Sequence, residues 1–190
     1  MIYTETQHLT LRSLERHELP RLVTLLNEWD VVRWLSVVPF PYTATDAEDF
    51  FAEIAPYDDA AEPQFFALSL KGNPDLIGGV GLHAPRTADA AEGENEIGYW
   101  LARDYWKRGL MREAVAAVID IGFARPTITS IGATTDPFNH ASQNVLRAAG
   151  LRDMGIVPRS YAALRGGDEV VRWLMTRADY ESQRLRSGAA

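Results

Sequence analysis

The sequence contains no cysteine, and this absence removes three kinds of chemistry at once. Disulfide bonds, thiolate nucleophiles and cysteine-ligated zinc sites are all excluded. A reduced, cytoplasmic setting is the simplest context for such a composition. Histidine is also sparse. The four histidines, His8, His17, His83 and His140, are spread along the chain without the short spacing typical of zinc ligands, so we expect no metal site.

Long apolar runs and an excess of positive charge are missing as well. No apolar stretch approaches the ~18 residues that span a bilayer, and the start of the chain, MIYTETQHLTLR, does not resemble a signal peptide. We therefore expect no membrane association. The net charge of −7 argues against a nucleic-acid partner, because phosphate binding relies on clustered Lys and Arg, and it suits an amine-bearing partner.

The hydrophobic patterning predicts one mixed α/β (α+β) domain over residues 1–180, followed by a tail at 181–190. A chain of 190 residues with 46% hydrophobic content can bury one substantial core. Period-two alternation and apolar runs predict seven strands, at 8–14, 64–70, 75–82, 94–102, 128–134, 154–163 and 168–177. Helical spacing predicts four helices, at 18–29, 43–54, 109–124 and 139–150.

Local signals refine two of these helices and one strand. Pro20 is tolerable only in the first turn of the first helix, and Thr45 with Glu48 three residues later forms a capping-box pattern for the second. The run GGVG at 78–81 fits no nucleotide-binding loop, so we expect these glycines to let another backbone approach a strand closely. No G-x-S-x-G motif supports serine-hydrolase chemistry.

A basic turn joins the predicted strand at 94–102 to the predicted helix at 109–124. Arg103, Lys107 and Arg108 precede Gly109, where the helix begins. A helix N-terminus presents unpaired N–H groups and the positive end of its dipole, and a glycine there lets an anion approach. The turn therefore fits a diphosphate site, and equally a solvated basic surface turn.

The helix NHASQNVLRAAGL carries small polar residues in its first turns. Asn139 is placed as the N-cap and Gly150 as the residue that ends the helix, so a purely structural role for Asn139 is one interpretation. Ser142 lies one turn further on, on the same side as Asn139. Asn144, taken alone, fits a solvated face.

Together these segments resemble the GNAT superfamily of acetyl-CoA-dependent N-acetyltransferases, in particular the branch that contains the ribosomal-protein N-terminal acetyltransferases. Three motifs carry the resemblance, in the expected order: E-h-G-Y-W-L (h apolar) at 96–101, W-x-[KR]-G-[YL]-[AM]-x-E-A at 106–114, and N-x-x-S-x-x-[VL]-x-x-x-x-G-[FL] at 139–151. Flanking segments extend it over almost the whole chain. Met111 stands where the family loop usually has a second glycine or alanine, a variant that this branch allows.

The resemblance implies a mixed sheet of about seven strands, splayed between the parallel strands at 94–102 and 128–134, with about four helices. It implies acetyl-CoA as co-substrate, with the backbone of Tyr99, Trp100 and Leu101 pairing with the pantetheine arm. Asn139 would bind the same arm, and Asn144 would lie near it. The N–H groups of the basic turn would hold the pyrophosphate; these belong to Lys107, Arg108, Gly109, Leu110, Met111 and Arg112.

Acetyl transfer to an amine has requirements that narrow the catalytic candidates. The amine must lose a proton to a base, an oxyanion needs N–H donors, and the leaving thiolate needs an acid. Glu96 is the first candidate for the base and Glu94 the reserve, although Glu96 can equally be a structural carboxylate. Ser142 is the candidate acid, because it lies one turn from Asn139. Many superfamily members use a tyrosine further along this helix, and Leu146 occupies about that place here. A backbone N–H near Trp100 or Leu101 would serve the oxyanion.

The acceptor is an amine-bearing small molecule or a peptide or protein N-terminus. We expect its groove between residues 30–43, the loop from His83 to Glu92 and the terminal hairpin that carries Tyr161, with an apolar wall from Trp34, Phe40 and Tyr42. A non-catalytic CoA-binding sensor or structural protein is the alternative function, and a nucleotide-binding regulator is disfavoured because no P-loop is present. A homodimer is compatible with the family.

Overall fold

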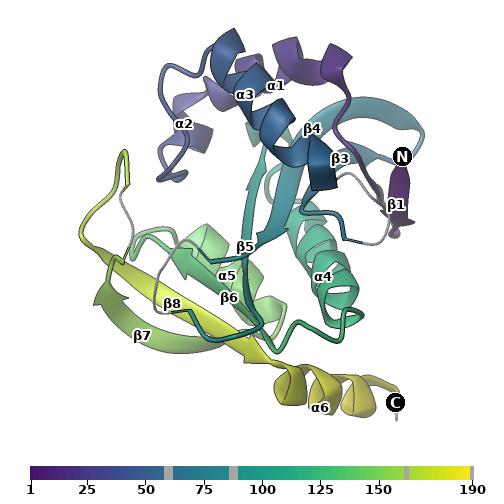
Figure 1. The fold of residues 1–190 in the computed structure, drawn as a ribbon, viewed down its shortest axis with the longest axis vertical. Helices are drawn as coiled ribbons and strands as arrows, with labels where there is room; N and C mark the ends of the chain where they lie inside the picture. The colour runs from purple at the N-terminus through teal and green to yellow at the C-terminus, as the bar shows by residue number, and fades with distance from the viewer. Residues whose placement is uncertain (58–61, 86–89, 161–162, 189–190) are drawn as a thin grey trace.

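The computed structural model describes residues 1–57, 62–85, 90–160 and 163–188, and these form one open mixed sheet with helices on both faces (Figure 1). The described strands lie side by side in the order β1-β2-β3-β4-β5-β6-β8-β7. All neighbouring strands are antiparallel except β5 and β6, which are parallel as predicted. The strand bounds are β1 Ile2–Glu5, β2 Leu9–Arg12, β3 Phe65–Leu70, β4 Asn73–His83, β5 Glu94–Leu101, β6 Ser130–Thr135, β7 Arg152–Pro158 and β8 Glu169–Thr176.

The helices of the described chain comprise the four that were predicted and two more. Their bounds are α1 Leu19–Leu26, α2 Trp29–Val32, α3 Ala44–Ile54, α4 Leu110–Phe123, α5 His140–Ala148 and α6 Arg177–Gly188. Short 3-10 turns lie at Arg16–Glu18, Ala55–Tyr57 and Arg103–Tyr105. Pro20 lies in the first turn of α1, where its missing N–H costs no hydrogen bond, and Gly150 ends α5 with a φ of 92°, both as predicted.

The capping box of α3 lies two residues earlier than predicted. Thr43 has an extended backbone and its Oγ1 accepts from the N–H of Asp46, while the carboxylate of Asp46 accepts from the N–H of Thr43 at 2.7 Å. Because the helix starts at Ala44, Thr45 is already inside the first turn. Glu48 instead pairs with Arg16 across 2.6 Å.

The predicted tail is largely helical, because α6 continues to Gly188. Arg177 anchors the start of α6 by donating to the carbonyls of Phe123, Arg125 and Ile128. The ring of Tyr180 then stacks on Phe123 with centroids 4.6 Å apart. These contacts come from sequence-distant residues, so the polar local sequence did not predict the helix.

The ends of the sheet also differ from the prediction. Strand β1 was not predicted, since a four-residue edge strand without clear alternation carries little signal, and it pairs with β2. Strands β7 and β8 are shorter than the predicted 154–163 and 168–177. Residues 161–162 of the connecting segment lie outside the described residues.

Two hydrophobic cores cover the two faces of the sheet. The larger one packs α4 and α5 against one face and includes Leu110, Val115, Val118, Ile131, Leu146 and Trp173. The smaller one packs α1 and α3 against the other face and includes Leu22, Leu26, Ala47 and Leu76. Gly78 of β4 allows the close backbone approach that was predicted, because an added Cβ would lie 2.6 Å from the carbonyl oxygen of Trp100.

The sheet splits between β5 and β6. Their parallel ladder joins only Glu94–Glu96 to Ser130–Gly132. Beyond it, β5 stays paired with β4 as far as Leu101, and β6 stays paired with β8 as far as Thr135. The inner edges of the two strands therefore diverge in the middle of the sheet, as the resemblance implied.

Candidate functional site

Glu96 lies at the point where β5 and β6 separate. It is the last residue of β5 in the parallel ladder, where its partner is Gly132. Its half-buried carboxylate accepts from Oγ1 of Thr134 at 3.3 Å, which links the two strands just past the last paired residues. His83 is its partner on β4, so both side chains leave the same face of the sheet.

The side chains of successive residues of β5 lie on opposite faces of the sheet. Ile97 and Tyr99 pack with the core that contains α4 and α5, whereas Trp100 packs with the core that contains α1 and α3. Glu96 is an even number of residues from Trp100 and so lies on its side. Gly98 lies there too, and a Cβ added to it would meet no atom within 4 Å. The face that carries Glu96 is therefore open beside it.

Tyr99 reaches α5 from the other face and meets Ser142. The hydroxyl group of Tyr99 donates to the backbone carbonyl of Ser142 at 3.1 Å, and its oxygen lies 2.8 Å from Oγ of the same residue. Burial raises the pKa of Tyr99 well above its usual value, and the hydrogen bond with Ser142 offsets only part of that effect. The phenol is therefore protonated throughout the neutral range.

Asn139 holds the start of α5 in place. Its Oδ1 accepts from the N–H of Ser142 at 3.1 Å, which confirms the predicted N-cap. This bond fixes the backbone of Ser142 opposite Tyr99. Asn144 is exposed, and its Oδ1 accepts from Arg147 at 2.9 Å, which matches the solvated alternative for this residue.

The N-terminus of α4 has the features of an anion site. Gly109 is its N-cap with a φ of 77° and provides no side-chain cap, and Lys107 is also left-handed with a φ of 60°. A Cβ on Gly109 would meet nothing within 4 Å, so the helix end is open. The side chains of Lys107, Arg108 and Arg112 are exposed around it, whereas those of Leu110 and Met111 are buried in the core. Those two residues can offer only backbone N–H groups to a ligand.

The turn before α4 is braced by aromatic residues. Trp106 donates from Nε1 to the carbonyl of Leu101 at 2.7 Å, and the guanidinium of Arg108 lies 5.5 Å from the ring centre of Tyr105. These contacts hold the turn at the end of β5, next to the diverging strands.

Glu94, the reserve candidate for the base, is engaged by other groups of the protein. Its carboxylate is buried and forms an ion pair with Arg172 of β8 at 2.6 Å. It also accepts from the N–H of Ala91 at 3.3 Å. The contacts of the two carboxylates therefore differ, because Glu94 is paired with an arginine and Glu96 lies where the strands separate.

Two of the three segments expected to form the acceptor groove contact each other. Arg165, in the loop between β7 and β8, donates to the carbonyls of Val32 at 3.2 Å, Leu35 at 2.8 Å and Val38. The N–H of the adjacent Leu164 donates to the carbonyl of Ser36 at 2.7 Å. The loop rises to the segment that follows α2 (Figure 1). It therefore joins one half of the divided sheet to the helical layer on the other half.

The predicted aromatic wall is only partly available. Tyr42 is buried, its hydroxyl donates to the carbonyl of Asp46, and burial raises its pKa to about 12, so it belongs to the core. Trp34 is half-buried under the guanidinium of Arg33, and Phe40 is exposed beside Trp29 with centroids 5.4 Å apart. Tyr161 and residues 86–89 of the predicted groove lie outside the described residues.

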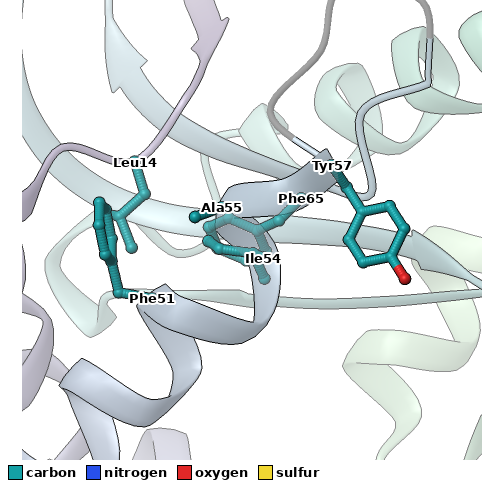
Figure 2. A pocket seen from close by; sticks show the side chains of 6 residues that line it. All are labelled: Leu14, Phe51, Ile54, Ala55, Tyr57 and Phe65. Carbon is teal, nitrogen blue, oxygen red and sulfur yellow. The ribbon is translucent and has the colours of Figure 1, made fainter.

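A separate apolar hollow lies between α3 and β3 (Figure 2). Its volume is about 30 Å³, close to the share of one water molecule in the liquid. Its lining comprises Leu14, Phe51, Ile54, Ala55, Tyr57 and Phe65. It is too small for an acceptor and belongs to the packing of α3.

Neither a metal centre nor a membrane segment is found in the described parts of the chain. No three His, Asp or Glu side chains there are grouped to hold a metal ion. None of the described helices combines the length and the apolar character of a membrane-spanning segment.

The sequence motifs predicted a site role only for the backbone of Tyr99, and predicted none for Thr134 or Arg165. The side-chain role of Tyr99 had a signal in the sequence, because a residue three positions from Glu96 on a strand must serve the opposite face. The contacts of Arg165 join residues more than 120 positions apart, and no local pattern predicts them.

Comparisons with known proteins agree with this geometry. Residues 8–152 match the family model described as an acetyltransferase (GNAT) domain. The uncharacterized N-acetyltransferase p20 of Bacillus licheniformis is 28% identical over 161 residues, which cover 85% of this chain and 88% of that protein.

Two solved structures share the fold. Mycobacterium smegmatis RimJ in complex with CoA-disulfide has a TM-score of 0.74 at 18% identity, covering 95% of this chain and 89% of that one. Spermidine N-acetyltransferase from Vibrio cholerae, in complex with CoA and spermine, has a TM-score of 0.72 at 20% identity, covering 91% of this chain and 98% of that one. Because the family model matches well over half of the sequence, the chain belongs to the GNAT acetyltransferase family.

Proposed function

We propose that the protein is an acetyl-CoA-dependent N-acetyltransferase that transfers an acetyl group to a primary amine. The amine attacks the thioester directly, through a tetrahedral intermediate. The observation that carries the proposal is the divergence of β5 and β6, with Glu96 on one face of β5 and the Tyr99–Ser142 pair on the other. A thioester between the strands would have a proton acceptor on one side and a hydroxyl pair on the other.

The residues around the opening suit the parts of CoA. The open N-terminus of α4 and the exposed Lys107, Arg108 and Arg112 fit a pyrophosphate, because backbone N–H groups and cations converge there. The inner edge of β5 from Ile97 to Leu101 has no strand partner on the β6 side, so its peptide groups suit the amides of an extended pantetheine arm. We assign Asn139 to the same arm, in addition to its observed role as the N-cap of α5.

Glu96 is the group that we assign to the amine proton. It lies beside the open space at Gly98, so an acceptor can reach it from that face. The carboxylate takes the proton directly or through a water molecule, and a backbone N–H near Trp100 or Leu101 stabilises the oxyanion. Thr134 holds the carboxylate at the point where the strands separate.

The acceptor is a primary amine on a small molecule or at a peptide or protein N-terminus. The net charge of −7 favours cationic amines by electrostatic attraction. We propose that the acceptor lies between the segment 32–40 and the loop that carries Arg165. The likeness to RimJ supports the ribosomal-protein branch, and the likeness to spermidine N-acetyltransferase supports a small polyamine equally well.

The experiment is a thiol-release assay with acetyl-CoA over a panel of polyamines, small amines and N-terminal peptides, with mass detection of the acetylated product. We expect turnover with at least one acceptor. Glu96→Gln should lower kcat by about 100-fold or more, the usual range for loss of a general base. Glu181→Gln, at an exposed position of α6, is the matched control and should behave as the wild type.

Two results would count against the enzyme. Absence of both turnover and calorimetric CoA binding would overturn the proposal entirely. Tight CoA binding without turnover on the whole panel would favour the non-catalytic CoA-binding protein instead. An unchanged kcat in Glu96→Gln would remove Glu96 from the mechanism.

A further inference from the structure

A floor without side chains lies beside Glu96 on its face of the sheet. Gly81 of β4 is the register partner of Gly98 of β5, and neither has a Cβ, so the surface between them is peptide backbone. A Cβ added to Gly98 would meet no atom within 4 Å, which leaves this floor open. The next pair on the same face joins His83 of β4 to Glu96. Two side chains that can accept a proton therefore border one open floor.

The contacts of His83 assign its two ring nitrogens. Nδ1 lies 2.8 Å from the carbonyl oxygen of Ala84, and a carbonyl only accepts, so this hydrogen bond places a proton on Nδ1. In the neutral ring Nε2 then carries the lone pair. Cδ2, which is bonded to Nε2, lies 3.5 Å from the Cβ position of Gly81. The edge of the ring that carries Nε2 therefore lies toward the floor.

Two carboxylates of β5 share this face with His83. Glu96 is its direct partner across the ladder. Glu94, two residues earlier, is paired with Arg172 of β8 at 2.6 Å. On the other side of β4, the residue opposite the floor is Phe65 of β3, which does not titrate. Among these described neighbours, Glu96 is the carboxylate that lies with His83 at the opening of the sheet.

Acetylation of a primary amine releases two protons. An α-amino group has a pKa of about 8 and an alkylamine of about 10, so the acceptor arrives as an ammonium ion at neutral pH. One proton must leave before the nitrogen lone pair can attack, and a second leaves as the C–N bond forms. A carboxylate holds one proton at a time. A second acceptor beside Glu96 lets both protons leave without exchange with solvent between the two steps.

We propose that Nε2 of His83 takes the proton of the bound ammonium ion, and that Glu96 takes the proton released during attack. This inference rests on the proposed function. The first transfer leaves a neutral amine and an imidazolium. The nitrogen then bonds to the thioester carbon and gives its proton to Glu96, and the C–S bond breaks with its electron pair on sulfur. The thiolate takes a proton from solvent, to which His83 and Glu96 return theirs.

The first test determines the tautomer of His83 and does not require turnover. Long-range 1H–15N NMR correlations distinguish a protonated ring nitrogen from a bare one, and the signals that disappear in His83→Asn belong to His83. We expect Nδ1 to carry the proton and Nε2 to be bare in the neutral ring, with and without CoA. A neutral ring with its proton on Nε2 would overturn the inference.

The second test compares ethylamine, an ammonium ion at neutral pH, with trifluoroethylamine, which is largely neutral there because fluorine withdraws electrons. His83→Asn keeps an amide nitrogen about where Nδ1 was, so it can still donate to Ala84, but it lacks Nε2. At neutral pH we expect this variant to lower kcat/KM for ethylamine by about 100-fold or more and to leave that for trifluoroethylamine near the wild-type value. Glu96→Gln should lower kcat/KM for both amines.

The pH profile separates loss of Nε2 from a structural defect. In His83→Asn, kcat/KM for ethylamine should rise about 10-fold for each pH unit, because the neutral fraction of the free amine rises in that proportion. Its Tm should equal that of the wild type. His17→Gln is the matched control, because His17 is exposed in the turn before α1 and pairs with Glu15 at 3.2 Å. This control should behave as the wild type with both amines.

The contrary results separate this inference from the proposed function. If CoA binds and ethylamine is acetylated, but His83→Asn leaves both amines unaffected or slows both equally, only the role of His83 is overturned. If the wild type neither bound CoA nor acetylated any amine, the proposed function and this inference would fall together.

Discussion

Replacement of Arg165 by alanine should loosen the contact between the β7–β8 loop and the segment after α2. The guanidinium donates to three backbone carbonyls, those of Val32, Leu35 and Val38. The backbone N–H of Leu164 adds a hydrogen bond to the carbonyl of Ser36. Loss of the Arg165 side chain thus removes three hydrogen bonds between the loop and this segment.

The expected loss of stability is about 2 kcal/mol. A hydrogen bond to a charged group contributes about 1.5–3 kcal/mol. The three bonds here share one nitrogen, Nη1, of a half-exposed guanidinium, so they do not add in full and water replaces part of what is lost. For a chain of this size, about 2 kcal/mol corresponds to a decrease in Tm of about 4–8 °C. Arg165→Lys should recover only part of it, because an ammonium group is more strongly hydrated than a guanidinium and costs more to bring out of water.

The assay combines calorimetric Tm with steady-state kinetics. We expect the KM of the acceptor to rise about 5-fold, equivalent to about 1 kcal/mol, because one side of its groove is less ordered. The dissociation constant of CoA should stay unchanged, since the hydrogen bonds found for Arg165 among the described residues go to residues 32–38 and not to α4 or α5. Arg184→Ala removes an exposed arginine on α6 and should change stability by less than about 0.5 kcal/mol.

Two outcomes would refute this reasoning. An unchanged Tm in Arg165→Ala would mean that the three hydrogen bonds contribute no net stability. A lower Tm with an unchanged acceptor KM would mean that the loop is structural and does not line the acceptor groove.

Three further outcomes are expected. Gly78→Ala should lower the free energy of unfolding by about 1–3 kcal/mol in urea denaturation, because its Cβ would overlap the carbonyl of Trp100. An unchanged urea midpoint of unfolding would show that β4 and β5 move apart at little cost. Arg172→Met should lower the free energy of unfolding by about 2–3 kcal/mol, because buried Glu94 loses its ion pair. Adding Glu94→Gln should restore part of this stability. If the double variant were no more stable than Arg172→Met, the unpaired charge of Glu94 would not be the cause of the loss. Asn139→Ala should cost about 1 kcal/mol as a lost N-cap and also weaken CoA binding by calorimetry, whereas an unchanged affinity would leave it only the structural role.

The sequence by itself determined the elements and the location of the opening in the sheet. Period-two and helical patterns identified all strands except β1 and all long helices except α6, because these signals depend on burial within a single element. The three motifs placed the opening between the strands at 94–102 and 128–134, and the ladder ends there at Glu96. Asn139 and Gly150 were identified correctly as the two ends of α5, since capping is a local property.

Only the tertiary structure decided what the individual side chains do. Glu94 and Glu96 are indistinguishable by pattern, yet Glu94 is paired with Arg172 of β8, whereas Glu96 lies at the opening. In the same way, the hydroxyl of Tyr99 meets that of Ser142, 43 residues away. The physical reason is that a hydrogen bond or ion pair depends on distances of about 3 Å between atoms. Sequence periodicity predicts which face of an element a residue occupies. Only the tertiary structure shows which atom of another element lies within hydrogen-bond distance of its side chain.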